Sequence, residues 1–470
     1  MHKPKLGAVF LAGDSWWESG VCEATKGPYA GFLDAVQSDV ERARATLAET
    51  CAVVSPGLLH TEAEVAAETR RLAEARVDAI VLCPIIWTND QPVITFLREA
   101  PDVPLLLWAY DPYGGFLEYF ALPGWLRASG AVSVQQCSNI LRRFGRHFEV
   151  VHGNEKDTQT RRELAAFGRA AAVRKSLEGA RIAVLPAPCR VVMGSWVDDF
   201  HLLERFGVEL VYVSAESYVE RVKAVSDADA TAYGEWLRGR CRFEGVEEAQ
   251  LLRSAKEAIA MARLAEDERL CGIALEDFHE AFYRLLGARP HLYHPRLGEL
   301  GCTVGLEADV PNVLATVLLA RLAGRPAMFN ELFNVDGHAN AVLMGHPGMG
   351  EPALGDPDSY LVTPDLEIDE SQPRGVWWSY RAKPGPMTFL NLTPEYGRLK
   401  AAVWQGAAMA GQRMMEGYAH MLVTPEHDAR DMFKRIVKLG LLQHWGTVHG
   451  DLRAELRCLA GMYGLDLVEL

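Results

Sequence analysis

Carboxylate and imidazole side chains recur in three stretches of this sequence, from residue 301 onward. In GCTVGLEADVPNVLATVLLARLAG, Glu307 and Asp309 stand just before an apolar run that predicts a helix. In RPAMFNELFNVDGHANAVLMGHPGMG, Glu331 follows the strand-like PAMF. The same stretch holds His346, whose glycine and proline neighbours exclude a helix.

The third stretch, LLQHWGTVHGD (441–451), carries His444 and His449 in a pattern that is typical neither of a helix nor of a simple strand. Mixed carboxylate and imidazole ligation with open positions suits Mn²⁺, with Co²⁺ or Mg²⁺ as substitutes. Carboxylates beside such an ion can also act as general base and general acid. The three stretches together therefore predict a metal site with acid–base chemistry.

Each of these residues also has a purely structural interpretation. Glu307 can be a helix N-terminal carboxylate that the helix dipole stabilises. A histidine in a loop, such as His346, is more often a hydrogen-bonding turn residue than a ligand, and HWGTVHG can be a turn with a packed tryptophan. Glu331 is harder to explain this way, because a carboxylate entering a core needs a partner. Asp336 and His338 are interpreted as loop residues.

Elements that could position these residues follow from the hydrophobic pattern. Apolar strand-like runs alternate with helical segments through the first 170 residues, as in KLGAVFLAG, DAIVLCP and VPLLLWAY. Strands that are apolar on both faces predict a parallel sheet covered by helices on both sides. The alternation starts again at ARIAVLPAP and continues through FGVELVYVS and LCGIALED. Two successive Rossmann-like, doubly wound α/β domains are expected.

The character of the chain changes at about residue 326, where glycine, proline and aromatic residues become frequent. Short strands joined by turns, hence a mostly β, barrel-like domain, are expected there. We therefore predict an N-terminal domain over 1–172, a central domain over 173–325 that carries Glu307, and a C-terminal domain over 326–470 that carries Glu331, His346 and His444.

The composition and the absence of certain motifs argue against several kinds of binding partner. The net charge of −14 disfavours nucleic acid and anionic membrane surfaces. Neither GxGxxG nor GxxxxGK[ST] occurs after the predicted strands, so no nucleotide cofactor is expected. The nine cysteines form no CxxC pair, and neither a signal peptide nor an apolar span of membrane length stands out. A cytoplasmic protein is expected.

The sequence resembles the superfamily of L-fucose isomerases and L-arabinose isomerases, which are manganese-dependent aldose–ketose isomerases. CTVGLEADVPNVLATVLLARLAGRPAMFNE and KPGPMT resemble stretches of the fucose isomerases, and GHPGMGEPAL resembles a histidine-containing glycine loop of the arabinose isomerases. QHWGTVHGDLRAELRCLAGMYGLDLVEL can be laid without gaps on the arabinose-isomerase ending, where a His-His-Thr-Val-Phe-Ser-His stretch precedes the last helix. VVHGNEKD resembles the end of that family's first domain.

This resemblance implies a role for individual residues. Glu307 and Glu331 match two metal-binding carboxylates that also serve as the acid–base pair, while His346 and His444 match the two histidine ligands. His449 matches a histidine that is not a ligand. A monosaccharide substrate and a homo-oligomer (trimer, tetramer or hexamer) are also implied. Four further residues are candidates for substrate binding: Trp16, Trp17, Trp87 and Gln136.

The reaction expected from the resemblance moves a proton from C2 to C1 of an open-chain aldose through a cis-enediolate, with O1 and O2 held by the metal. Two other activities stay open. A metal-dependent lyase or epimerase acting on a sugar or sugar acid would use the same enediolate. A sugar-binding protein without catalysis would use the same two Rossmann-like units. The preferred sugar, and which glutamate is the base, do not follow from the sequence.

Overall fold

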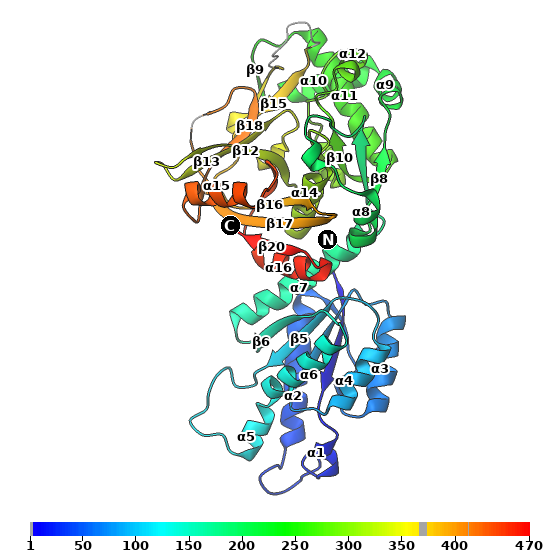
Figure 1. The fold of residues 1–470 in the computed structure, drawn as a ribbon, viewed down its shortest axis with the longest axis vertical. Helices are drawn as coiled ribbons and strands as arrows, with labels where there is room; N and C mark the ends of the chain where they lie inside the picture. Colours follow the sequence, from blue (N-terminus) through cyan, green and yellow to red (C-terminus); the bar gives the residue numbers. More distant parts are fainter. Residues whose placement is uncertain (1–2, 366–373, 412) are drawn as a thin grey trace. The chain divides into compact units, whose positions relative to one another are not determined.

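The computed structural model describes residues 3–365, 374–411 and 413–470. The chain forms two compact units (Figure 1). The first comprises residues 1–175 and 454–464, and the second comprises residues 176–453 and 465–470.

The first unit is built on a parallel sheet of order β2-β1-β4-β5-β6, with β3 also paired to β1. Alternate residues of its central strands point to two separate cores. Phe10 and Trp108 pack with residues of α2 and α7 on one face, while Leu11 and Leu107 pack with residues of α3, α4 and α6 on the other. Burial on both faces explains why these strands are apolar throughout. The strands are β1 (Lys5–Leu11), β2 (Ala52–Val54), β3 (Leu58–Leu59), β4 (Ala79–Pro84), β5 (Leu105–Tyr110) and β6 (Glu149–Gly153); the helices are α1 (Ser15–Glu18), α2 (Phe32–Thr50), α3 (Glu62–Glu74), α4 (Asp90–Glu99), α5 (Leu122–Arg127), α6 (Gly130–Arg143), α7 (Thr158–Leu177) and α16 (Arg453–Tyr463).

The second unit begins with another parallel sheet, of order β11-β10-β7-β8. Its strands and the helices around it are β7 (Arg181–Leu185), β8 (Glu209–Tyr212), β10 (Leu270–Leu275), β11 (Thr303–Gly305), α8 (Asp199–Phe206), α9 (Ala215–Lys223), α10 (Asp227–Arg238), α11 (Glu248–Asp267), α12 (Glu280–Leu286), α13 (Arg296–Leu300) and α14 (Val310–Ala323).

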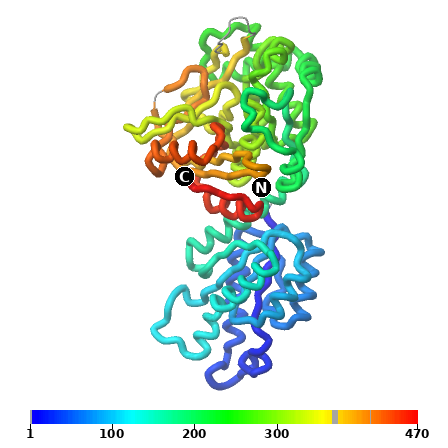
Figure 2. Tube along the Cα trace, viewed as in Figure 1, coloured from blue at the N-terminus to red at the C-terminus, as the bar shows by residue number. Residues whose placement is uncertain are grey.

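Antiparallel strands make up most of the rest of the second unit. They pair in the order β16-β19-β12-β13-β18-β17-β20, and β16 also pairs with β17, which closes the sheet into a barrel. The C-terminal strand β20 lies beside β17 (Figure 2) and runs parallel to it. These elements are β12 (Met328–Asp336), β13 (Ala341–Pro347), β16 (Gly385–Glu395), β17 (Arg398–Ala408), β18 (Tyr418–Pro425), β19 (His444–His449), β20 (Asp466–Glu469) and α15 (Ala429–Lys438). A small sheet of β9 (Arg242–Phe243), β14 (Leu361–Pro364) and β15 (Val376–Ser379) packs in the same unit.

Helix α14 joins the parallel sheet to the barrel. It packs against β10 and β11 on one side and against β16 and β19 on the other. Almost every residue of the helix is buried, which explains an apolar sequence without a polar face. At Gly446, an added Cβ would lie 2.8 Å from the backbone nitrogen of Thr316, so only glycine allows the helix this close to β19.

The predicted fold class is confirmed: two parallel α/β sheets precede a region rich in antiparallel strands. Two local expectations were wrong. The barrel strands are not all short, since β16 and β17 each have 11 residues. The stretch around His444 is a regular strand, and its pattern hid this because both faces of β19 are buried. Among the described residues, no helix is both long and apolar enough to cross a membrane. The division into three domains stays a prediction.

Candidate metal centre

Glu307 lies in the turn between β11 and α14, at the carboxyl end of the second parallel sheet. Its backbone is left-handed, with φ of 57°, and Ala308 follows with φ of 47°. Such conformations are costly for residues other than glycine and persist only where the surroundings hold them. Here the backbone N–H of Glu307 donates to Asp277 Oδ1 at 2.8 Å, and that of Ala308 donates to the carbonyl of Leu275 at 2.9 Å.

His444 is the first residue of β19 and is fully buried. Its Nδ1 lies 2.8 Å from Oδ2 of Asp309, the residue that caps the N-terminus of α14. An imidazole that donates from Nδ1 to a carboxylate keeps a free lone pair on Nε2. That Nε2 atom faces Glu307 Oε2 at 3.5 Å.

His346 is placed in the same way at the end of β13. Its Nδ1 lies 3.0 Å from the carbonyl oxygen of Pro347, so Nδ1 is the donor and Nε2 is left free. Nε2 lies 3.7 Å from Glu307 Oε1. The Nε2 atoms of both histidines are buried and have no hydrogen-bond partner among the described residues.

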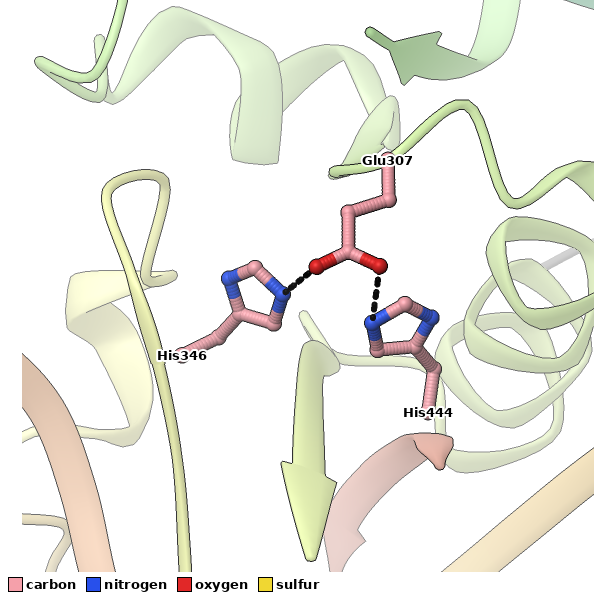
Figure 3. Close-up of side chains that lie close together, drawn as sticks. All are labelled: Glu307, His346 and His444. Carbon is pink, nitrogen blue, oxygen red and sulfur yellow. Dashed lines mark ion pairs between the residues drawn. The ribbon is translucent and has the colours of Figure 1, made fainter. Parts of the chain in front are cut away.

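Figure 3 shows the two imidazoles on either side of the Glu307 carboxylate, each facing a different oxygen. The ligand atoms of Glu307, His346 and His444 all lie within 4.8 Å of one another, and all three residues are buried. Buried polar atoms without partners are costly, and a divalent cation would satisfy the two Nε2 atoms and the carboxylate together. These residues therefore fit a divalent metal of the kind that accepts nitrogen and oxygen ligands.

The electrostatics of His346 agree with this interpretation. Burial lowers its pKa, but the carboxylates of Glu307, Glu331 and Asp277 outweigh that effect and raise the pKa to about 9. Without a cation, a proton on His346 offsets the buried negative charge. A metal ion would have to displace that proton, so the site binds either a proton or a metal ion.

Glu331 lies beside this cluster without being part of it. It is the register partner of His444 on β19 and of Gly345 on β13. Its side chain is only half-buried, and it does not belong to the group whose ligand atoms lie within 4.8 Å. The structure therefore brings three of the four predicted ligands together and places the fourth next to them. That Glu331 is a ligand or an acid–base group stays a prediction.

Supporting residues that the sequence did not single out surround the cluster. The side chain of Gln443 donates to Glu307 Oε2 at 3.2 Å. His291 is buried with its Nε2 3.8 Å from Asp277 and its Nδ1 3.2 Å from Asp365, and its ring packs against Gly348. Asp277 could have been found, because it ends a predicted parallel strand next to the one that leads to Glu307. His291 lies in an irregular segment that has no local pattern.

Three of the four substrate-binding candidates, Trp16, Trp17 and Trp87, follow β1 and β4 in the first unit, and the fourth, Gln136, lies on α6. Trp16 Nε1 donates to the carbonyl of Trp87 at 3.0 Å, and Trp87 Nε1 donates to Gln136 Oε1 at 3.1 Å. Trp17 stacks on the ring of His60, with centroids 3.9 Å apart. The structure thus gathers Trp16, Trp87 and Gln136 in one network, and their contact with substrate stays a prediction.

His449 lies at the opposite end of β19 from His444. Its Nε2 is 2.9 Å from the carbonyl oxygen of Lys383, which lies just before β16. It does not belong to the cluster of three ligand residues. His444 and His449 are therefore separated by the length of β19, and only His444 lies at the cluster.

Comparison with known proteins gave the following relatives, and no family model matches the chain. The chain is 22% identical to the sulfoquinovose isomerase of Alkalicoccus urumqiensis over 401 residues, which cover 84% of this chain and 86% of the relative. It is 22% identical to the sulfoquinovose isomerase of Priestia megaterium over 399 residues, covering 83% and 85% of the two chains. With that of Clostridium sp. (strain MSTE9) it shares 24% identity over 387 residues, covering 79% and 81%.

Proposed function

We propose that this protein is a metal-dependent aldose–ketose isomerase that converts an aldose into its ketose through a cis-enediolate. The observation that supports metal binding is the buried cluster of Glu307, His346 and His444. The Nε2 atoms of both histidines lack a hydrogen-bond partner and face the Glu307 carboxylate. Manganese is the ion proposed, with Co²⁺ or Mg²⁺ as substitutes.

The enzyme class is supported by the relatives. Their similarity extends over about four fifths of this chain and of their own length, and each is named for an aldose–ketose isomerisation. The resemblance to L-fucose and L-arabinose isomerases is narrower and stays a prediction. The relatives' shared name makes sulfoquinovose, a hexose with a sulfonate on C6, the first substrate to test for this protein.

The residues have distinct tasks in the proposed reaction. A divalent ion bound at the cluster would supply the Lewis acidity that polarises the sugar carbonyl and stabilises negative charge on O1 and O2. His346 and His444 would hold it as neutral imidazoles, with Asp309 fixing the orientation of the His444 ring. Gln443 and the backbone contact to Asp277 keep the Glu307 carboxylate directed at both rings.

Proton transfer is assigned to Glu307 and Glu331. Isomerisation takes a proton from C2 and returns one to C1, and it moves a second proton between the two oxygens, so a base and an acid are both needed. Glu331 suits this role because its half-buried carboxylate lies next to the buried cluster, where it can meet substrate that enters from solvent. Glu307 is the second carboxylate at the same place.

The experiment combines metal analysis with a substrate panel. We expect purified protein to hold about one divalent ion per chain, and to convert sulfoquinovose or another aldose into its ketose when loaded with Mn²⁺. An isomerase yields a ketose of the same mass as the substrate. A lyase that eliminates water yields a lighter product, and an epimerase yields another aldose. Pentoses, 6-deoxyhexoses, hexoses and aldonates should therefore be compared with product identification by NMR.

Variants separate the roles of the residues. Glu307→Gln and Glu331→Gln should lower kcat by at least about 100-fold in a folded protein, and His444→Ala should lower the bound metal per chain. Glu395→Gln, an exposed carboxylate of the barrel, is the matched control and should keep the wild-type rate. Wild-type turnover in all three site variants would rule the proposal out.

A further inference from the structure

His291 lies between two of the segments that carry the metal cluster, without belonging to the cluster itself. It stands in the irregular stretch between α12 and α13, and its side chain is fully buried. Its ring packs against Gly348, where an added Cβ would lie 2.9 Å from Cδ2 of the imidazole. Because Gly348 comes two residues after His346, the ring contacts the turn through which the chain leaves that ligand residue.

The two ring nitrogens of His291 each face a buried carboxylate. Nε2 lies 3.8 Å from Asp277 Oδ2, and Nδ1 lies 3.2 Å from Asp365 Oδ2. The other oxygen of Asp277 accepts the backbone N–H of Glu307 at 2.8 Å. One carboxylate therefore joins His291 to the turn that carries Glu307, while the contact with Gly348 joins it to the turn after β13.

A positive charge on His291 fits this arrangement. Burial lowers its pKa, but the carboxylates of Asp365 and Asp277 outweigh that effect and raise the pKa to about 9. Among the described residues, Asp277 forms its one ion pair with His291. A buried carboxylate is costly without a cation, and hydrogen bonds to an ionised acceptor are roughly twice as strong as those to a neutral one. The ring thus supplies the charge that the Asp277 carboxylate needs in order to hold the Glu307 turn.

Both turns have backbones that must be held in place. Glu307 has a left-handed φ of 57°, a conformation that persists only where the surroundings support it. Gly348 has a φ of 87°, which glycine adopts readily, and the His291 ring lies where a side chain would be. The ring itself is kept in position by Trp377 of β15, which stacks on it with 5.9 Å between the centroids.

We propose that His291 is a positioning residue of the metal centre, which sets the separation of two ligand-bearing turns from a place between them. Through Asp277 it holds the turn of Glu307 by charge. Through Gly348 it holds the turn after β13 by packing. The inference rests on the metal binding of the proposed function and adds to it a residue that touches neither the metal ligands nor substrate.

The test measures Mn²⁺ affinity and backbone protection in the same variants. His291→Gln keeps a side chain that can donate to a carboxylate but removes the positive charge. We expect the Kd for Mn²⁺ to rise by about tenfold at neutral pH. In the metal-free protein, hydrogen–deuterium exchange of the peptide that contains Glu307 should become at least about threefold faster, because the acceptor of its N–H has lost its cation.

A double-variant comparison separates positioning from a general loss of stability. In Asp277→Asn the residue that joins His291 to Glu307 is already neutral. Adding His291→Gln to it should therefore change the exchange of the Glu307 peptide by less than about twofold. His294→Gln is the matched control, because it removes a histidine of the same stretch whose Nδ1 accepts the backbone N–H of Arg296. It should keep the wild-type Mn²⁺ affinity and exchange, even where its melting temperature falls.

Asp365→Asn takes the place of His291→Gln if that variant does not fold, since it keeps the imidazole and removes the carboxylate that faces Nδ1. Changes of the same sign are then expected. Three results would overturn the inference: wild-type exchange and affinity in the folded variant, faster exchange spread evenly over the chain, or an undiminished effect in the Asp277→Asn background. If the wild type binds no divalent ion, the proposed function fails, and exchange of the Glu307 peptide in the metal-free protein decides the inference by itself.

Discussion

At the scale of single residues, Asp309 is the residue on which both the fold and the site depend. Its Oδ1 accepts the backbone N–H of Asn312 and so caps α14, while its Oδ2 accepts from the side chain of Asn312 and from His444 Nδ1. The sequence placed Glu307 and Asp309 correctly at the start of a helix. It could not reveal the bond to His444, because 135 residues separate the two partners.

Asp309→Asn should therefore impair metal binding more than folding. Asparagine has one acceptor oxygen where aspartate has two, so it cannot keep both the cap on the backbone N–H of Asn312, which Oδ1 accepts, and the bond from the His444 ring, which Oδ2 accepts. We expect the affinity for Mn²⁺ to fall by about 10–100-fold, as measured by titration of free Mn²⁺. Asp198→Asn alters the N-cap of α8, which has no ring partner, and should change only the melting temperature. An unchanged affinity in Asp309→Asn would contradict this role.

At the scale of elements, the parallel strands could be predicted from the sequence as continuous apolar runs, because both of their faces are buried. The same property concealed β19, whose buried glycine, threonine and tryptophan look irregular when read alone. Long-range pairing also decides where Glu331 lies, since its neighbour His444 on β19 comes from a distant part of the chain. The sequence alone indicated which residues could bind a metal. The distances between their side chains depend on how the barrel strands pair.

Gly446→Ala should affect the site through the packing of α14 on β19. A Cβ at this position would lie 2.8 Å and 2.9 Å from the backbone N and Cα of Thr316, so the helix must move away from the strand. We expect a loss of about 1–3 kcal/mol in the free energy of unfolding. Weaker Mn²⁺ binding should accompany it, because Asp309 on the helix and His444 on the strand must meet. Gly239→Ala is the control, since its nearest contact is an ordinary 3.6 Å. Equal melting temperatures for the two variants would contradict this account.

At the scale of the whole molecule, buried charge ties stability to pH. Glu257 of α11 is buried, and desolvation raises its pKa to about 8 despite the positive charges of His291 and Arg253. The pKa of His291 is lowered by burial, but the carboxylates of Asp365 and Asp277 outweigh this and raise it to about 9. Both groups hold a proton in the folded state that the unfolded chain releases at lower pH. Both therefore make the protein less stable as the pH rises.

Glu257→Gln tests the carboxyl part of this dependence. In the unfolded chain the group ionises near pH 4.5, and in the folded protein near pH 8, so the wild type loses stability through that window. Glutamine cannot ionise, so the variant should gain on the wild type by about 3 kcal/mol between pH 5 and pH 7.5. Urea unfolding at several pH values measures the difference. Glu204→Gln, which changes an exposed residue of α8, is the control. Its free energy of unfolding should change with pH as that of the wild type does. If Glu257→Gln also runs parallel to the wild type, then the pKa of Glu257 is the same in the folded protein as in the unfolded chain, and this account of Glu257 is wrong.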